Sequence, residues 1–185
     1  MAATILMMAA ASAPSLFYPQ IAEQLGLVPV ATTLVFAVYT FTLLAALLYL
    51  GPLSDHIGRR PVVTAGSLAL ALSLAMFWFA DSLATLLVAR ALQGLAAGLL
   101  IPALSAMMID FEPPSHPNIA ALWNTIGPMI GLGTGALGAA LLLDLTPEPT
   151  AAVFGPLVLA FLTVAAMVWS TPELVPKTRI RRGDL

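Results

Sequence analysis

The sequence predicts an all-α membrane protein, a bundle of six transmembrane helices. Of its 185 residues, 60% are hydrophobic and only 9% are charged, and its mean hydropathy is +0.98. A soluble domain carries about 25% charged residues, and a core of this size is too small to hide so much apolar surface from water. Six charge-poor intervals are long enough to cross a hydrocarbon layer of about 30 Å, which takes about 20 helical residues.

The six expected spans follow one another with short polar links. They cover residues 1–22, 24–54, 61–80, 82–109, 113–143 and 149–172. The first lacks the positively charged start of a signal peptide, so it is interpreted as a membrane helix. Gly and Pro at the links end and restart helices, and Ser82 offers an N-terminal cap for the fourth span. Together, residues 1–172 are expected to form one bundle.

The distribution of Lys and Arg predicts how the bundle is oriented. Arg59 and Arg60 lie between the second and third spans, and four more basic residues follow the sixth. The links on the opposite side contain acidic residues and no basic ones. Positive residues favour the cytosolic side. We therefore expect a multi-pass protein of the plasma membrane with both termini in the cytosol, where residues 173–185 form a basic tail.

The composition argues against catalysis. There is no cysteine, so neither a disulfide nor a thiol metal site is possible. No nucleophile lies beside a general base, and the two histidines, His56 and His116, are far apart in sequence. We expect no enzyme activity, no cofactor and no metal site. Without a basic domain, no nucleic-acid partner is expected either.

The most polar stretch in the first half of the chain is "GPLSDHIGRRPVV", residues 51–63. Gly and Pro end one helix there, Gly58 permits a tight turn, and Asp55 and Arg59 are spaced to form an ion pair on a helical turn. One interpretation is a simple topology signal. The stretch also closely resembles the cytoplasmic loop signature of the major facilitator superfamily. The matching residues are Gly51, Leu53, Ser54, Asp55, Gly58, Arg59, Arg60 and Val63.

That resemblance implies a gate. In this family the loop holds the cytosolic side closed, with its Asp meeting the N-terminal end of a helix in the second half of the transporter. Asp55 is then the gating residue and Arg59 its local partner. The loop arginines are expected to pair with acidic groups at the cytosolic end of the fourth span, where Asp110 and Glu112 are available. One departure is His56, where the family usually has a permanent cation.

The fourth span contains an arginine, Arg90, followed by Gln93 and Gly94 on the same helix face. An arginine inside a membrane helix costs about 2.5–3.5 kcal/mol on insertion scales. Either its side chain reaches to the outer interface, or it faces a polar cavity beside Gln93. The stretch resembles the family's R-x-x-Q-G signature, which implies a role in coupling or substrate binding. Tyr39, Thr42, Trp123 and Asn124 are further cavity candidates, and Tyr18 and Trp169 are expected to be interface anchors.

The fifth span carries glycines at every fourth position, which leave one bare helix face for close packing. These are Gly127, Gly131 and Gly135, and Pro128 can kink the helix. Gly94 is expected to serve packing in the same way. "GPMIGLG" resembles the antiporter signature G-P-x-x-G-G, with Leu132 in place of the second glycine of the pair. This resemblance implies the drug/proton antiporter branches of the superfamily.

The resemblance implies that the chain is the N-terminal six-helix half of the major facilitator fold, whose transporters have about twelve helices. The resemblance implies half of a secondary active transporter, exporting a small amphipathic compound by alternating access. Its expected partners are the lipid bilayer, the small-molecule substrate and a second six-helix bundle, either another copy or a separate chain. The alternative is a non-transporting fragment or a regulatory membrane subunit, since no acidic residue lies near mid-membrane.

Overall fold

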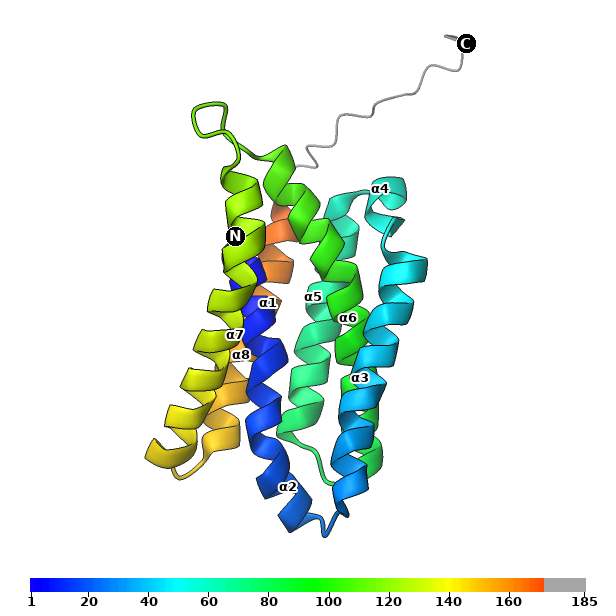
Figure 1. Cartoon of the computed structure of the whole chain (residues 1–185), viewed down its shortest axis with the longest axis vertical. Helices are drawn as coiled ribbons and strands as arrows, with labels where there is room; N and C mark the ends of the chain where they lie inside the picture. The colour runs from blue at the N-terminus through cyan, green and yellow to red at the C-terminus, as the bar shows by residue number, and fades with distance from the viewer. Residues whose placement is uncertain (172–185) are drawn as a thin grey trace.

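A computed structural model describes residues 1–171 of the chain and shows a bundle of helices (Figure 1). Within these residues, six helical segments are long and apolar enough to cross a membrane: Ala2–Gln24, Pro29–Leu50, Arg59–Trp78, Leu83–Asp110, Ile119–Leu145 and Pro149–Ser170. The expected fold class is thereby confirmed. The expected basic tail, residues 173–185, lies outside the described residues, so the division between bundle and tail stays a prediction.

The first span is not one continuous α-helix. It consists of α1 (Ala2–Ser12), a 3-10 turn (Ala13–Phe17) and α2 (Tyr18–Gln24). Pro14 lies in the 3-10 turn and Pro19 in the first turn of α2. Proline lacks the backbone N–H that an α-helix needs, so the two prolines account for the break.

The second span, α3, runs from Pro29 to Leu50 and is shorter at both ends than expected. The expected bounds were those of the stretch without charged residues, which is apolar but not helical throughout. The ends of the helix itself are set by turn residues. Before α3, Gly26 has a φ of 60°, a conformation that favours glycine. After α3, the chain forms the short helix α4 (Leu53–Ile57) and then α5 (Arg59–Trp78).

The fourth span, α6 (Leu83–Asp110), begins as expected. The Ser82 hydroxyl accepts a hydrogen bond from the backbone N–H of Thr85 at 3.2 Å and caps the helix. The fifth span, α7 (Ile119–Leu145), starts later than expected because the proline-rich stretch before it forms turns. The last span, α8 (Pro149–Ser170), begins at the expected proline.

The helices pack in a defined order around a common core. α6 lies between α3 and α5, α8 packs on α5, and α7 packs on α1 and α8. Phe17, Phe77 and Phe154 are completely or almost completely buried, and the Phe154 ring lies 5.2 Å from Phe17 and 6.0 Å from Phe77 between ring centroids. These rings join the first span to α5 and α8 near the end of the bundle opposite α4.

The outer surface is strongly apolar. Phe41 is 72% exposed, Leu48 76% and Met129 71%. Such side chains are unfavourable in water and favourable in hydrocarbon, so this surface contacts the lipid bilayer.

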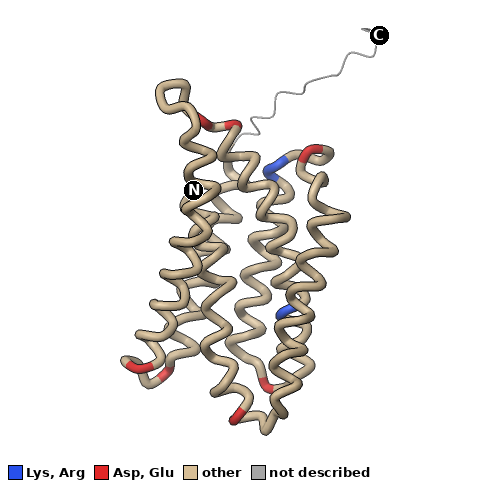
Figure 2. The backbone as a smooth tube through the Cα atoms, viewed as in Figure 1, with Lys and Arg blue, Asp and Glu red and all other residues tan. Residues whose placement is uncertain are grey.

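Charged residues gather at the two ends of the bundle (Figure 2). The α4 end carries Arg59 and Arg60. The opposite end carries Glu23 and Asp144 at the ends of α2 and α7, and Asp81 and Glu148 in the links. Arg90 is the exception, since it lies within the length of α6.

Candidate functional site

The chain between α3 and α5 folds into a compact charged loop at one end of the bundle. α4 supplies a single helical segment from Leu53 to Ile57, and Gly58 then adopts a φ of 99°, which favours glycine. α5 begins immediately afterwards, at Arg59. Leu53 packs against the core and Ser54 is only 4% exposed, so the loop is anchored by its apolar side.

Arg59 joins the loop to α6. Its Nε lies 2.6 Å from Oδ2 of Asp110, the last residue of α6. An Arg59 terminal nitrogen lies 3.9 Å from Oδ1 of Asp55, at the expected spacing of four residues. The Asp55 side chain is 66% exposed, whereas that of Arg59 is 23% exposed. The loop is therefore held to α6 mainly through Asp110, and the Asp55 carboxylate remains accessible.

Arg60 makes a contact that the sequence did not indicate. Its guanidinium lies 4.7 Å from the ring centroid of Trp169 and donates a hydrogen bond to the Trp169 backbone carbonyl. Trp169 itself is 59% exposed at the end of α8, a position that suits an interface anchor. The start of α5 is thus tied to the end of the sixth span.

Glu112 does not contact the loop. Its Oε1 accepts a hydrogen bond from the backbone N–H of Ala120 at 3.4 Å, in the first turn of α7. A carboxylate there is favoured by the partial positive charge of a helix N-terminus. Of the two expected loop partners, the structure brings only Asp110 to Arg59.

Arg90 is buried inside the bundle, with 2% of its surface exposed, and does not reach the interface. Its Nε donates a hydrogen bond to the Tyr18 hydroxyl, and a terminal nitrogen donates to Oε1 of Gln93. Gln93 in turn donates to the backbone carbonyl of Ala10 at 2.9 Å. This network connects α6 to both halves of the interrupted first span.

Aromatic rings surround the Arg90 guanidinium. Its central carbon lies 4.9 Å from the ring centroid of Tyr18, 5.3 Å from Tyr39, 5.2 Å from Phe77 and 5.7 Å from Phe36. Ring faces stabilise a cation when water is excluded. No carboxylate pairs with Arg90 among residues 1–171, and its second terminal nitrogen has no hydrogen-bond partner there. The expectation that Tyr18 is an interface anchor was wrong, because Tyr18 is 4% exposed and holds Arg90.

The other cavity candidates do not join this cluster. Asn124 is half-buried on α7, and its Oδ1 has no partner within the described part of the chain. The Thr42 hydroxyl donates to carbonyls of its own helix, those of Val38 at 2.8 Å and Tyr39 at 3.0 Å. Tyr39 is the expected cavity residue that the structure places beside Arg90.

Glycines allow two pairs of helices to approach closely. A Cβ at Gly94 would lie 2.6 Å from the Tyr39 carbonyl oxygen and 2.9 Å from the Leu43 nitrogen on α3. Cβ atoms at Gly131 and Gly135 would collide with the α1 backbone. At Gly127 the nearest atom is 3.9 Å away, which is an ordinary contact, so this glycine is not required for close approach. α7 continues as a helix through Pro128.

The α1–α7 contact yields a prediction about stability. Gly131→Ala would place a Cβ 2.6 Å from the Cβ of Met8 and against the Ile5 carbonyl, and we expect it to destabilise the bundle by about 1–3 kcal/mol. Gly133→Ala is the matched control in the same helix, because no atom lies within 4 Å of its new Cβ. Thermal unfolding in detergent measures both, and equal unfolding temperatures for the two variants would contradict the packing.

No group of three or more His, Asp or Glu side chains in residues 1–171 is placed to hold a metal ion. The features of the chain are instead a charged loop that closes on α6, and an arginine buried between α3, α5, α6 and the first span.

Comparison with known proteins identifies the family. The family model of the Major Facilitator Superfamily matches residues 1–184, and the chain belongs to this family of membrane transporters. The multidrug efflux pump LfrA of Mycolicibacterium smegmatis is 33% identical over 187 residues, covering 82% of this chain and 36% of that protein. The multidrug resistance protein MdtL of Shewanella sp. is 30% identical over 145 residues, covering 76% and 36%.

A shorter match has a higher identity. The multidrug resistance protein MdtM of Escherichia coli K12 is 53% identical over 45 residues, which cover 24% of this chain and 11% of that protein. The chain spans at most 36% of the length of these three relatives.

Proposed function

We propose that the chain is one half of a secondary active transporter that exports a small amphipathic compound by alternating access. It is active when paired with a second six-helix bundle. The observation that carries this proposal is the loop at α4. Arg59 fixes the loop to Asp110, while the Asp55 carboxylate is 66% exposed and available to a neighbouring helix end.

A gate of this kind requires a partner, and the physical reason is electrostatic. An exposed carboxylate gains little from Arg59 at 3.9 Å, since ion pairs in water are worth about 0–1 kcal/mol. The N-terminal end of a helix in a second bundle would add the attraction of its partial positive charge. Substrate sites of such transporters lie between two bundles, so one bundle supplies half of the site.

The charge distribution supports an orientation. Arg59 and Arg60 mark the α4 end, and Glu23, Asp81, Asp144 and Glu148 mark the opposite end. We place the α4 end in the cytosol by the positive-inside rule, in the plasma membrane. The contact between Arg60 and Trp169 puts the end of α8 on the same side.

Export of an amphipathic compound is supported by two observations. The relatives described above are named as multidrug efflux and multidrug resistance proteins. The rings of Tyr18, Phe36, Tyr39 and Phe77 around Arg90 provide a polar and aromatic environment of the kind that amphipathic molecules use.

A non-transporting fragment or regulatory subunit is the second candidate, and one observation favours it. Every carboxylate in residues 1–171 lies at an end of a span or in a link. A proton-coupled transporter needs a titratable group that reaches the pathway, and arginine does not titrate. A transporting assembly would have to obtain that group from the second bundle.

Reconstitution separates the two candidates. The native assembly, purified with whatever second bundle it holds, is placed in proteoliposomes with an imposed pH gradient, and movement of the amphipathic dye Hoechst 33342 is followed by fluorescence. The proposal predicts dye transport that disappears when the gradient is collapsed. The absence of gradient-dependent dye movement, in an assembly shown to contain two bundles, would overturn the export proposal.

A further inference from the structure

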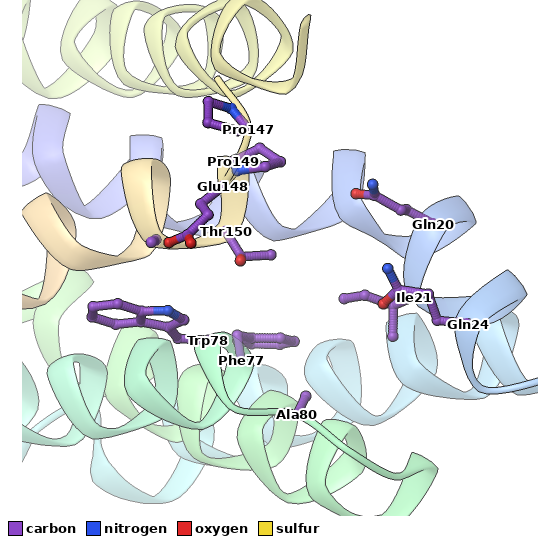
Figure 3. Close-up of a pocket in the computed structure, with 11 residues that line it drawn as sticks. Gln20, Ile21, Gln24, Phe77, Trp78, Ala80, Pro147, Glu148, Pro149 and Thr150 are labelled. Atoms are coloured by element: carbon purple, nitrogen blue, oxygen red, sulfur yellow. The ribbon is translucent and has the colours of Figure 1, made fainter. Parts of the chain in front are cut away.

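A cavity of about 330 Å³ lies at the end of the bundle opposite α4 (Figure 3). Three parts of the chain surround it: α2, the end of α5, and the link from α7 into α8. The residues that define its chemistry are Gln20, Gln24, Phe77, Trp78, Glu148 and Thr150. Ligand cavities range from about 300 to 1,000 Å³, so this one suits a small group.

The lining combines a carboxylate with an aromatic ring. In Figure 3 the Glu148 carboxylate points toward the side of the cavity where Trp78 lies. Glu148 is exposed, and both ion pairs found among residues 1–171 involve Arg59 at the other end of the bundle. The Phe79 ring stacks on the indole at 5.1 Å between ring centroids. A carboxylate beside an aromatic ring is suited to a cation.

The charges around the cavity favour the same kind of ligand. Glu23, Asp81 and Asp144 lie at this end of the bundle, and no lysine or arginine of the described chain lies in the links there. Arg90 is the nearest described cation, on the Phe77 side, with its guanidinium 5.2 Å from that ring centroid. Repulsion from Arg90 therefore directs a bound positive charge toward Glu148 and Trp78.

We propose that this cavity binds a quaternary ammonium group of the size of choline, with the charge between Glu148 and the Trp78 ring. Ring faces are an effective surface for such ions, which cannot donate hydrogen bonds. The group could come from a free compound in solution or from the head group of a phospholipid, because the ends of the spans lie at the level of the lipid head groups. The site does not depend on the transport proposed above.

Tryptophan fluorescence tests the site directly. The chain has three tryptophans, so Trp123→Phe with Trp169→Phe leaves Trp78 as the only reporter. In nanodiscs of phosphatidylglycerol, choline chloride is expected to change the Trp78 emission saturably, against sodium chloride of equal ionic strength. The neutral analogue 3,3-dimethylbutan-1-ol, which has the same shape without the charge, is expected to produce no saturable change.

A variant that removes the carboxylate charge of the cavity provides a second test. Glu148→Gln is expected to weaken choline binding about fivefold. Asp144→Asn is the matched control, because Asp144 lies at the same end but does not line the cavity, and it is expected to bind choline as the parent does. A saturable response to the neutral analogue equal to that of choline, no response to choline, or unchanged choline binding in Glu148→Gln would each overturn the proposal.

The lipid composition of the nanodiscs distinguishes the two sources of the ammonium group. If the head group of phosphatidylcholine occupies the site, nanodiscs of that lipid will abolish the response to choline. If the site takes a free ligand, choline will still give a saturable response in phosphatidylcholine, at a higher concentration because the anionic lipid no longer attracts it. Both results support an ammonium site, and the comparison between choline and its neutral analogue in phosphatidylglycerol nanodiscs remains the decisive one.

Discussion

Asp55→Asn is expected to lower transport by the assembled protein about fivefold, the factor that corresponds to about 1 kcal/mol. The same substitution is expected to leave the stability of the isolated bundle nearly unchanged. Its ion pair with Arg59 is long, at 3.9 Å, and its side chain is 66% exposed, so little stability is lost with the charge. The effect on transport arises because a neutral amide gains less than a carboxylate from the N-terminal end of a helix in the second bundle.

Closure of the cytosolic side can be measured with a single cysteine, because the chain has none of its own. His56→Cys places a thiol at an exposed position on α4, beside Asp55, where closure against a second bundle would cover it. We expect faster maleimide labelling from the α4 side in Asp55→Asn than in the parent assembly.

Asp110→Asn provides the contrast with Asp55→Asn. It weakens the 2.6 Å contact between Asp110 and Arg59, whose side chains are 42% and 23% exposed. We expect this loss to destabilise the isolated bundle by about 1 kcal/mol. Unchanged transport and unchanged labelling in Asp55→Asn would contradict the gate. A fall in stability equal to that of Asp110→Asn would show that Asp55 acts only within this bundle.

Arg90→Met is expected to reduce transport at least about tenfold, because it removes the only buried cation among residues 1–171. The expected change in the stability of the bundle is small, because two contributions oppose each other. The substitution leaves the Tyr18 hydroxyl and Oε1 of Gln93 without the donor that Arg90 supplies, which costs about 1–3 kcal/mol for each buried group. It also removes a buried charge that no carboxylate neutralises within residues 1–171.

Two companion variants keep the Arg90 test informative. Arg90→Lys retains the charge but cannot reach both Tyr18 and Gln93 with one ammonium group, so an intermediate loss of transport is expected. Tyr18→Phe retains the ring beside the guanidinium and removes the hydroxyl. Dye transport in proteoliposomes and thermal unfolding measure both properties, and parental transport in Arg90→Met would show that this arginine only supports packing.

Features set by local spacing could be predicted from the sequence. Asp55 and Arg59 are four residues apart on adjoining helical turns, and Asp110 ends the helix that packs beside them, so their meeting follows from the charges and the span order. Ser82 lies directly before an apolar run, which is the position of a cap. The six spans follow from length and hydropathy alone.

Features set by packing between distant segments could not be predicted. Arg60 and Trp169 are 109 residues apart, and Arg90 and Tyr18 are 72 apart, so only the fold brings them together. From the sequence, the Arg90 side chain could either reach the interface or stay inside the bundle. The aromatic rings that hold it inside come from three different spans. Glu112 was assigned to the loop because it lies at the expected cytosolic end of the fourth span, whereas in the structure it bonds to the first turn of α7.

The break in the first span could be predicted from the sequence only in part. Pro14 and Pro19 are visible in the sequence, and proline disfavours a continuous helix. Prolines are nevertheless tolerated in membrane helices, as Pro102, Pro128 and Pro156 are inside α6, α7 and α8. Which proline interrupts a helix depends on its neighbours in space.

The mass of the native assembly tests the central proposal most directly. The protein is tagged, extracted from its own membrane in a mild detergent and measured by native mass spectrometry. One copy of this chain has a mass of 19.2 kDa. The proposal predicts a protein mass of at least about twice that value, whether the second bundle is another copy, a separate chain or a continuation of the same polypeptide. A species holding a single 19.2 kDa bundle at every concentration tested would leave Asp55 with nothing to close against, and would contradict the proposal.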